Sequence, residues 1–383
     1  MLPLSEYEID AERGFLPSWD PIRELPPALA PWDEYAYALP KLLVSGRVRH
    51  FLRQMPLLDP SPYLETEGQW RRAMQALSYL GHAWVWGESP PSDTLPANIA
   101  LPWYAVAQHL GRPPVLSYAS YALDNWYRLD KEGPIALDNI ALIQNFLGGL
   151  DEEWFILIHV AIEAAAAPAI RSLPLLVEAV QREDIGAAEQ ALASVAEALK
   201  AMYQILLRMP EACDPYIYYH RVRPYIHGWK NNPSLPEGLY YEGVEAYGGK
   251  PQQLRGETGA QSSIVPALDA ALGIVHADDP LRAYLREMLD YMPPAHRRFV
   301  LDIENAGISR FFFAQTPTLK ETYNACLHWL ERFRSKHLEY AAQYIARQHQ
   351  LSSANPTDVG TGGTPFMPYL AKHRDETEAH KLA

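Results

Sequence analysis

The 383-residue sequence predicts an all-α protein. Apolar residues recur at steps of three and four over long stretches, which is the spacing that forms one face of a helix. Alternating runs of β-branched residues joined by hairpin turns are absent from the sequence. Proline pairs at 90–91 and 113–114 separate the helical stretches and mark their ends.

The net charge of −13, with 48% hydrophobic and 21% charged residues, predicts a globular protein with a large core. The longest basic run is 296–298, so the sequence lacks the basic face of a nucleic-acid-binding protein. Cys213 and Cys326 are too few for a disulfide scaffold or a cysteine-rich zinc site, and they fit a reducing cytosol. No signal peptide and no uncharged apolar stretch of about 20 residues is present. We therefore expect a cytoplasmic protein without membrane or nucleic-acid partners.

The first 146 residues predict a small N-terminal helical domain. Residues 1–40 are rich in proline and tryptophan and are expected to form an extended arm. Helices are expected over 34–38 and on through 42–53, over 67–87, and from Pro102 at a first helical turn to a closing Gly111.

Residues 147–383 predict a larger C-terminal helical domain. It opens with a helix over 151–170, and residues 154–162 contain one polar side chain, His159, so this helix must be buried on all sides. Glu163 lies four residues later on the same face and could pair with His159 or share a metal, although one such pair is weak evidence. Further helices are expected over 174–179, 184–209 and 262–274, from the cap at 279–280 through 292, and from a start within 292–299.

The longest predicted helix runs from Thr318, which with Glu321 forms a capping box, to about residue 350. Its apolar face is interrupted at His337, and Arg334 lies one turn earlier on nearly the same side. A neutral imidazole aimed into an apolar cavity beside a cation suits an axial haem ligand, with the arginine at a haem propionate. The alternative is a core histidine bonded to a backbone carbonyl, which is the commoner role of a buried histidine.

Three other segments have the composition of a binding site. Residues 216–229 combine four tyrosines with two histidines and two arginines, which is unusual for a packing helix. Residues 248–263 are small and would let the backbone approach a ligand closely, and Asp269 lies inside the apolar run that follows. The glycines and threonines of 360–364 predict a mobile lid over 352–366.

Eight segments, taken in order along the chain, resemble the indoleamine 2,3-dioxygenase family of haem enzymes. They are WVWG at 84–87, SYASYALDNW at 117–126, EAAAAPAI at 163–170, the 21 residues 223–243, GAQSS at 259–263, MPPAHRRF at 292–299, FRSKHL at 333–338 and GTGGT at 360–364. Each segment alone is weak evidence, but together they cover nearly the whole chain.

This resemblance implies a two-domain helical haem dioxygenase fold. Haem b would lie between helices of the large domain, 147–383, and the small domain, 1–146, would cap it. His337 would be the proximal ligand to the iron, Arg334 would meet a propionate, and Asp269 would support that arginine.

The resemblance also implies a distal pocket for an indole substrate. Arg223 would hold the substrate carboxylate in a bidentate pair, and Thr361 would contact the substrate ammonium or a propionate. His159 and Arg223 are thus the expected catalytic residues. The expected substrate-binding residues are Tyr118, Phe155, His159, Tyr218, Tyr219, Arg223, Thr258, Gly259 and Thr361.

Three departures from the family pattern affect the expected substrate. Animal members carry serine at the position of His159 and phenylalanine at that of Tyr218. They carry Gly-Gly-Ser where this chain has Gly256, Glu257 and Thr258. A distal histidine is similar to that of the tryptophan 2,3-dioxygenases, which hydrogen-bond the indole N–H.

The expected activity is opening of the indole 2,3-bond of L-tryptophan, with O2 as co-substrate, to give N-formylkynurenine in the kynurenine pathway. One alternative is a haem enzyme of the same fold acting on another indole, as in pyrrolnitrin synthesis. Another is a haem sensor without turnover, and a plain structural helical protein is the last. The sequence does not distinguish a monomer from a homo-oligomer.

Overall fold

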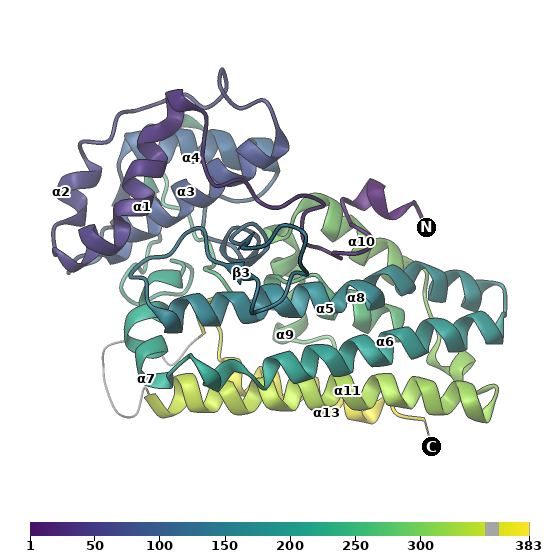
Figure 1. Ribbon diagram of the computed structural model, residues 1–383. Coiled ribbons are helices and arrows are strands. Elements are labelled where there is room, and N and C mark those ends of the chain that lie inside the picture. The colour runs from purple at the N-terminus through teal and green to yellow at the C-terminus, as the bar shows by residue number, and fades with distance from the viewer. Residues whose placement is uncertain (349–359, 383) are drawn as a thin grey trace.

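The computed structural model describes residues 1–348 and 360–382, and over these residues the chain is mostly helical with very little strand, which confirms the all-α prediction (Figure 1). The helices are α1 Ala30–Val44, α2 Val48–Leu52, α3 Glu67–Trp86, α4 Ala97–Leu110, α5 Leu150–Gln181, α6 Ile185–Leu206, α7 Pro215–Ile217, α8 Ile264–Ala271, α9 Pro280–Met288, α10 Pro294–Asn305, α11 Pro317–Ala341 and α13 Phe366–Ala379. Strand β1 Thr94–Leu95 pairs in parallel with β4 Tyr240–Tyr241, and β2 Tyr127–Arg128 pairs antiparallel with β3 Ile140–Ala141.

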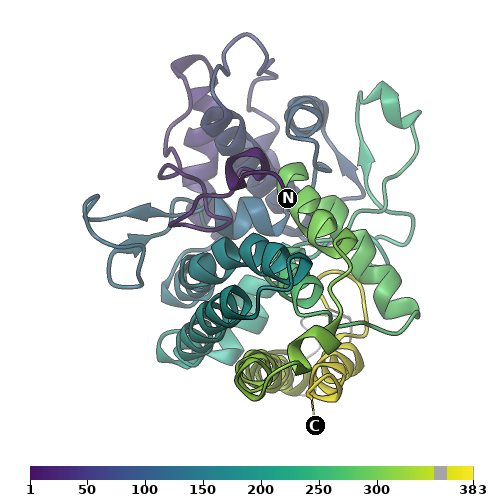
Figure 2. The same cartoon turned by 90° about the vertical axis from the view of Figure 1, so that its right-hand side faces the viewer.

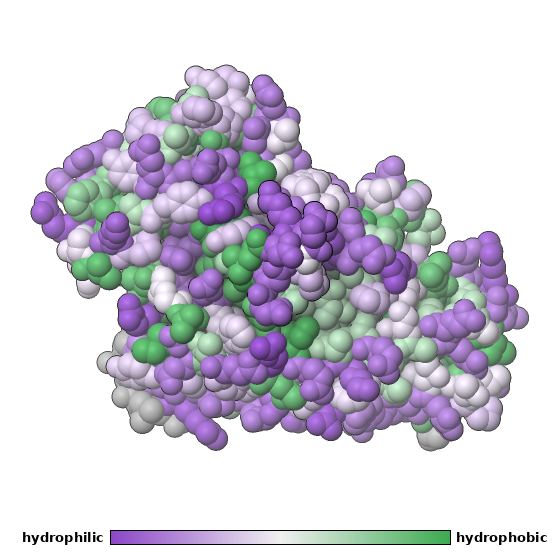
Figure 3. All heavy atoms as spheres, viewed as in Figure 1, coloured by the Kyte–Doolittle hydropathy of each residue, from purple (hydrophilic) through white to green (hydrophobic). Residues whose placement is uncertain are grey.

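Three long helices form the body of the larger half. Helix α6 lies between α5 and α11, and α13 packs along α11, as the two ribbon views show (Figures 1 and 2). Helix α5 is apolar and long enough to cross a membrane, but 67% of its most apolar window is buried inside the protein. Hydrophilic residues cover much of the row of helices below it (Figure 3). Helix α5 is therefore a core helix of this fold.

The upper half of Figure 1 contains α1 to α4 around a second hydrophobic core. Trp32 and Trp103 are fully buried there. Trp229 and Tyr241, from much later in the chain, belong to the same core. The first 146 residues therefore do not form this core alone, and the division of the chain at residue 146 stays a prediction.

Two of the expected helices have different ends in the structure. The helix expected through 34–53 is broken into α1 and α2 by a turn that contains Gly46, whose φ is +65°. The helices expected at 151–170 and 174–179 are one helix, α5, with Pro168 and Pro174 inside it. A proline in a helix interior costs about 3 kcal/mol, and the packing of α5 along the length of α6 offsets that cost.

The starts of α4 and α11 were also predicted wrongly. Helix α4 begins at Ala97, so Pro102 lies inside it rather than in its first turn, whereas Gly111 does follow its end in a left-handed conformation. The cap of α11 is Thr316, whose hydroxyl oxygen accepts from the backbone N–H of Leu319, and the expected capping box is not formed. Proline at the first helical position, Pro317, fixes this earlier start. By contrast, α3 and α6 match their predicted ranges closely.

Candidate active site

Helix α11 presents His337 on the face that packs into the larger core. Tyr323, Cys326 and Leu330 on that face are fully buried. The side chain of His337 has accessible surface, yet burial, and secondly the charge of His159, lower its pKa to about 4. Accessible surface on a side chain that is surrounded by protein is typical of a residue lining an interior hollow. The charge of a protonated His159 on α5 would thus act on His337 on α11.

The two ring nitrogens of His159 have different environments. Nδ1–H donates to the backbone carbonyl of Phe155 at 2.7 Å, so the lone pair lies on Nε2. Burial lowers the pKa of His159, which keeps the ring neutral. Its ring centroid lies 4.8 Å from that of Phe155 and 6.0 Å from that of Tyr118. Nδ1 of His159 thus makes a structural hydrogen bond to the backbone, while Nε2 can accept a hydrogen bond from a ligand.

The sequence allowed a pair between Glu163 and His159, but Glu163 instead binds two hydroxyl groups from other segments. Its carboxylate accepts from the Tyr118 hydroxyl at 2.9 Å and from the Ser262 hydroxyl at 2.8 Å. Burial raises the pKa of Glu163 to about 7, although both hydroxyls oppose that shift. The backbone N–H of Tyr118 donates to Gln261 at 2.9 Å. Helix α5 is therefore tied to the segment that carries Thr258 and Gly259.

The tyrosine-rich segment forms the next wall. A π-helical turn over Tyr218–Val222 runs into a 3-10 turn over Arg223–Ile226. The rings of Tyr218 and Phe155 lie 4.5 Å apart, and the Arg223 guanidinium carbon lies 5.5 Å from the ring centre of Tyr219. Arg223 has no accessible surface, and burial lowers its pKa while the two neighbouring tyrosines raise it. A buried guanidinium in this position can hold a carboxylate.

The small-residue segment and the expected lid lie against each other. A Cβ atom added to Gly259 would meet nothing within 4 Å, so the backbone there borders open space. The Thr361 hydroxyl donates to the carbonyl of Glu257, and the Thr361 carbonyl accepts from the N–H of Gly228 at 3.3 Å. A Cβ at Gly363 would lie 2.5 Å from the Lys230 carbonyl. Residues 360–364 are thus docked on this segment, while residues 352–359 of the expected lid lie outside the described residues.

Arg334 is buried and bound from several sides. Its guanidinium forms an ion pair of 2.6 Å with Asp269, donates to the Thr377 hydroxyl, and lies 3.4 Å from the His373 carbonyl. Burial alone would raise the pKa of Asp269, but Arg334 and His276 hold it well below its usual range. The contact between Asp269 and Arg334 that the resemblance implied is therefore present.

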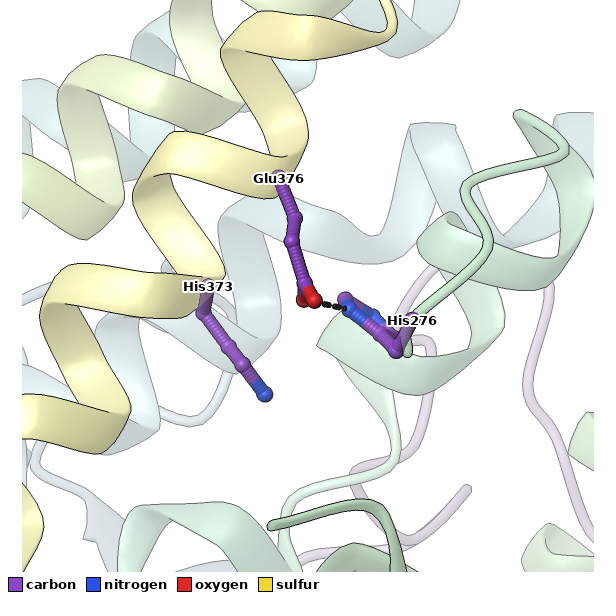
Figure 4. A group of neighbouring side chains, drawn as sticks. All are labelled: His276, His373 and Glu376. Carbon is purple, nitrogen blue, oxygen red and sulfur yellow. Dashed lines mark hydrogen bonds and ion pairs between the residues drawn. The ribbon is translucent and has the colours of Figure 1, made fainter. Parts of the chain in front are cut away.

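A cluster of His276, His373 and Glu376, which was not predicted from the sequence, continues this network (Figure 4). Nδ1 of His276 lies 2.6 Å from Glu376 and Nε2 lies 3.0 Å from Asp269, while the ring stacks on that of His373 at 4.6 Å. Burial would lower the pKa of His276, but the two carboxylates raise it. Three of these side chains have the ligand atoms of a metal site. Because both nitrogens of His276 are already bonded, the cluster is a hydrogen-bonded chain that supports Arg334. In the sequence, the spacing of 373, 376 and 377 would have indicated that these three side chains lie on one face of a helix.

A separate cavity of about 210 Å³ lies near the N-terminal arm. It is lined by charged residues including Glu8, Arg71, Arg112 and Asp124, and none of the predicted site residues borders it. Arg71 forms ion pairs with Glu8 and Glu67 there. The cavity belongs to a largely buried ion-pair network of Arg71, Arg112 and Asp124, and neither His159 nor His337 lines it.

These observations describe a helical protein in which α5 and α11 each carry a histidine with a lowered pKa, and in which a glycine-rich segment is docked on the residues before Gly259. The indoleamine 2,3-dioxygenase family model matches residues 3–380, and the chain belongs to that family. It is 38% identical to indoleamine 2,3-dioxygenase 1 of Rattus norvegicus, over 99% of this chain and 96% of that protein. It is 34% identical to indoleamine 2,3-dioxygenase 2 of Homo sapiens (98% and 95%) and 31% identical to the 6-hydroxytryptophan 2,3-dioxygenase of Fusarium equiseti (98% and 97%).

Membership confirms that the protein is a dioxygenase of this family, which implies a haem. The residues present fit that group. His337 offers an accessible, neutral imidazole, and no hydrogen bond to its ring is found in the part of the chain that the structure describes. Within the same part, Nε2 of His373, beside Arg334, is buried without a partner. A propionate near Arg334 would satisfy such a nitrogen.

Proposed function

We propose that the protein opens the indole 2,3-bond of L-tryptophan or a closely related indoleamine with O2, giving N-formylkynurenine or the corresponding product. The observation that carries this proposal is the neutral imidazole of His159, whose Nε2 is left as an acceptor and whose charge when protonated would lower the pKa of His337. The names of the relatives, which include indoleamine and 6-hydroxytryptophan dioxygenases, support the substrate class. The departures at His159, Tyr218 and Glu257 favour a tryptophan derivative as the alternative substrate.

We assign the haem contacts to α11 and α8. His337 would hold the iron of a haem b, and Arg334, fixed by Asp269, would hold a propionate. When bound, the haem supplies activation of dioxygen, and since both oxygen atoms enter the product, no reductant is consumed in each turnover. The network of His276 and Glu376 keeps Asp269 charged, so that Arg334 stays in position.

The substrate would be held at both ends by this chain. The Arg223 guanidinium would bind the carboxylate in a charge-assisted pair. His159 Nε2 would accept the indole N–H, and the ring would lie against Phe155 and Tyr218. Because these groups are held by helices, the protein contributes orientation and the exclusion of water rather than a nucleophile.

The docked residues 360–364 would cover the substrate. Thr361 already contacts the backbone of Glu257, and Thr258 precedes the open backbone at Gly259. We propose that this segment opens to admit substrate and closes for turnover. We also propose that the site lies between helices of residues 147–383, capped by residues 1–146, in a cytoplasmic protein whose two cysteines are free and buried.

The test is turnover of the haem-loaded protein with L-tryptophan in air and in ¹⁸O₂. We expect a product heavier than tryptophan by two oxygen atoms, both labelled. A haem-loaded protein whose spectrum changes with tryptophan but that releases no oxygenated product would be a sensor, and the proposed activity would be wrong. Oxygenation of another indole only would identify the alternative substrate.

A further inference from the structure

Arg255 carries a buried guanidinium to the docked residues 360–364. The residue is 6% exposed. Its Nη1 donates to the carbonyl of Gly362, and its Nη2 forms an ion pair of 2.8 Å with Glu287 on α9. The guanidinium carbon also lies 5.0 Å from the ring centre of Tyr284, one turn earlier on that helix. One side chain therefore joins the glycine-rich segment to α9.

Two cations share the carboxylate of Glu287. It lies 2.8 Å from Nη2 of Arg255 and 2.6 Å from Nζ of Lys230. Burial alone would raise the pKa of Glu287, but the hydrogen bonds from both cations hold it below its usual value, so the group stays charged. The backbone of Lys230 also borders the docked segment, since a Cβ on Gly363 would lie 2.5 Å from the Lys230 carbonyl. Glu287 thus ties Arg255 to a second residue that touches residues 360–364.

The hydrogen bonds that hold residues 360–364 differ in strength. The backbone N–H of Gly228 donates to the Thr361 carbonyl at 3.3 Å, and the Thr361 hydroxyl donates to the Glu257 carbonyl. Both of these donors are neutral. The donor from Arg255 is charged, and a charge-assisted hydrogen bond is about twice as strong as a neutral one. Of these three bonds, the one from Arg255 should therefore contribute most to the docked position.

The backbone that carries Arg255 is fixed by contacts outside the docked segment. The N–H of Arg255 donates to the Tyr291 hydroxyl at 2.9 Å. The carbonyl of the preceding Leu254 accepts from the backbone N–H groups of Trp229 and Lys230, both at 2.9 Å. Loss of the guanidinium should therefore release the docked segment, while the backbone from which Arg255 extends keeps its conformation.

We propose that Arg255 is the positioning residue of the docked segment, because it holds the Gly362 carbonyl so that residues 360–364 cover the proposed substrate pocket. The proposal rests on the proposed function and names the side chain that keeps the pocket closed. Opening breaks the bond from Arg255 to Gly362, while the ion pair with Glu287 remains. The buried guanidinium therefore keeps a carboxylate partner when it releases the segment, and the opening is reversible.

Hydrogen exchange at three successive backbone N–H groups of the full-length, haem-loaded protein tests the docking without turnover. The N–H of Gly228 is bonded to the docked segment, whereas those of Trp229 and Lys230 are bonded to the carbonyl of Leu254. We expect Arg255→Met to speed exchange at Gly228 by about tenfold or more, since a charged hydrogen bond to the segment is lost. Exchange at the other two groups should stay at the wild-type rate.

Two further variants and a kinetic measurement complete the test. Glu287→Gln removes the carboxylate that fixes the guanidinium and should give a smaller increase in exchange at Gly228. Arg286→Met removes a partly exposed ion pair with Glu304 from the same helix, and it should leave exchange at all three groups unchanged. With L-tryptophan as substrate, Arg255→Met should lower kcat severalfold with haem content unchanged.

Other outcomes overturn the proposal. Wild-type exchange at Gly228 in both Arg255→Met and Glu287→Gln would show that docking does not depend on Arg255. Faster exchange at all three N–H groups would make Arg255 a residue of the fold, and fast exchange at Gly228 with wild-type kcat would show that the docked position does not serve the reaction. If Arg255→Met does not fold, Glu287→Gln decides by the same readouts. If the wild type turns over no indole, the proposed function has failed, and the exchange rates still decide whether Arg255 holds the segment.

Discussion

At the residue scale, His159 shows how one side chain can serve the fold and the ligand together. Nδ1 bonds to Phe155 and Nε2 remains an acceptor. We expect His159→Ser to retain haem and folding. Its kcat/KM for L-tryptophan should fall by an amount equal to about 1–2 kcal/mol of transition-state stabilisation, since a hydrogen bond is lost. The difference in kcat/KM between tryptophan and 1-methyltryptophan, which has no indole N–H, should become smaller. Steady-state kinetics with both compounds measures this, and an equal loss toward both would make His159 a purely structural residue.

Arg223 should distinguish substrates by their carboxylate. Its guanidinium is buried beside Tyr219, where a charge-assisted bond is strong. We expect Arg223→Leu to lower kcat/KM for L-tryptophan by an amount equal to about 2–4 kcal/mol of transition-state stabilisation. Indole, which has no carboxylate, serves as the control substrate and should be affected far less. A similar loss with indole would mean that Arg223 holds the fold rather than the substrate.

Glu163 should make stability depend on pH. Its pKa rises from 4.5 in the unfolded chain to about 7 in the fold. Below pH 4.5 both states are protonated. Between pH 4.5 and about 7 the unfolded state ionises while the folded state stays protonated, so stability falls by about 3 kcal/mol over this range and changes little above it. We expect Glu163→Gln to lose less unfolding free energy than the wild type between pH 5 and pH 8, measured by denaturant titration. An unchanged pH dependence would contradict the assignment to Glu163.

At the scale of elements, apolar spacing predicted the helix bounds well where one face of the helix packs on a core and a capping residue marks its start. Helices α3 and α6 are of this kind. Apolar spacing failed for α5, whose prolines are tolerated because α6 and α8 pack along it. It placed His337 and Arg334 on one face of α11 but could not pair Arg334 with Asp269 from sequence spacing.

The docked glycine segment can be tested with a matched pair of variants. Gly363 and Gly248 both have positive φ, +74° and +57°, so alanine is strained at either position. A Cβ would lie 2.5 Å from the Lys230 carbonyl at Gly363 but would meet nothing within 4 Å at Gly248. We expect Gly363→Ala to lower kcat severalfold with haem content unchanged, and Gly248→Ala to leave kcat near wild type. Equal kcat values in the two variants would exclude a catalytic role for the docked position.

At the scale of the whole molecule, the proposed site lies where the two hydrophobic cores meet. Phe155 is packed against both cores, and Tyr118 belongs to a third, smaller cluster beside them. Sequence patterns predicted the presence of the helices but not this meeting of cores, which depends on late segments such as the one around Trp229 joining the upper core. A ligand bound there contacts elements from both halves, so its binding should be coupled to the stability of the entire fold.

That coupling can be measured by haem-dependent thermal unfolding. A ligand that binds only the folded state stabilises it by about 2.7 kcal/mol at a hundredfold excess over its Kd. We expect haem to raise the Tm of the wild type and to have little effect on His337→Ala, because the iron loses its protein ligand. His328→Ala, at an exposed position on the same helix, controls for loss of an imidazole from α11 and should respond like the wild type. A full haem-induced shift in His337→Ala, with an unchanged haem spectrum, would show that another residue holds the iron.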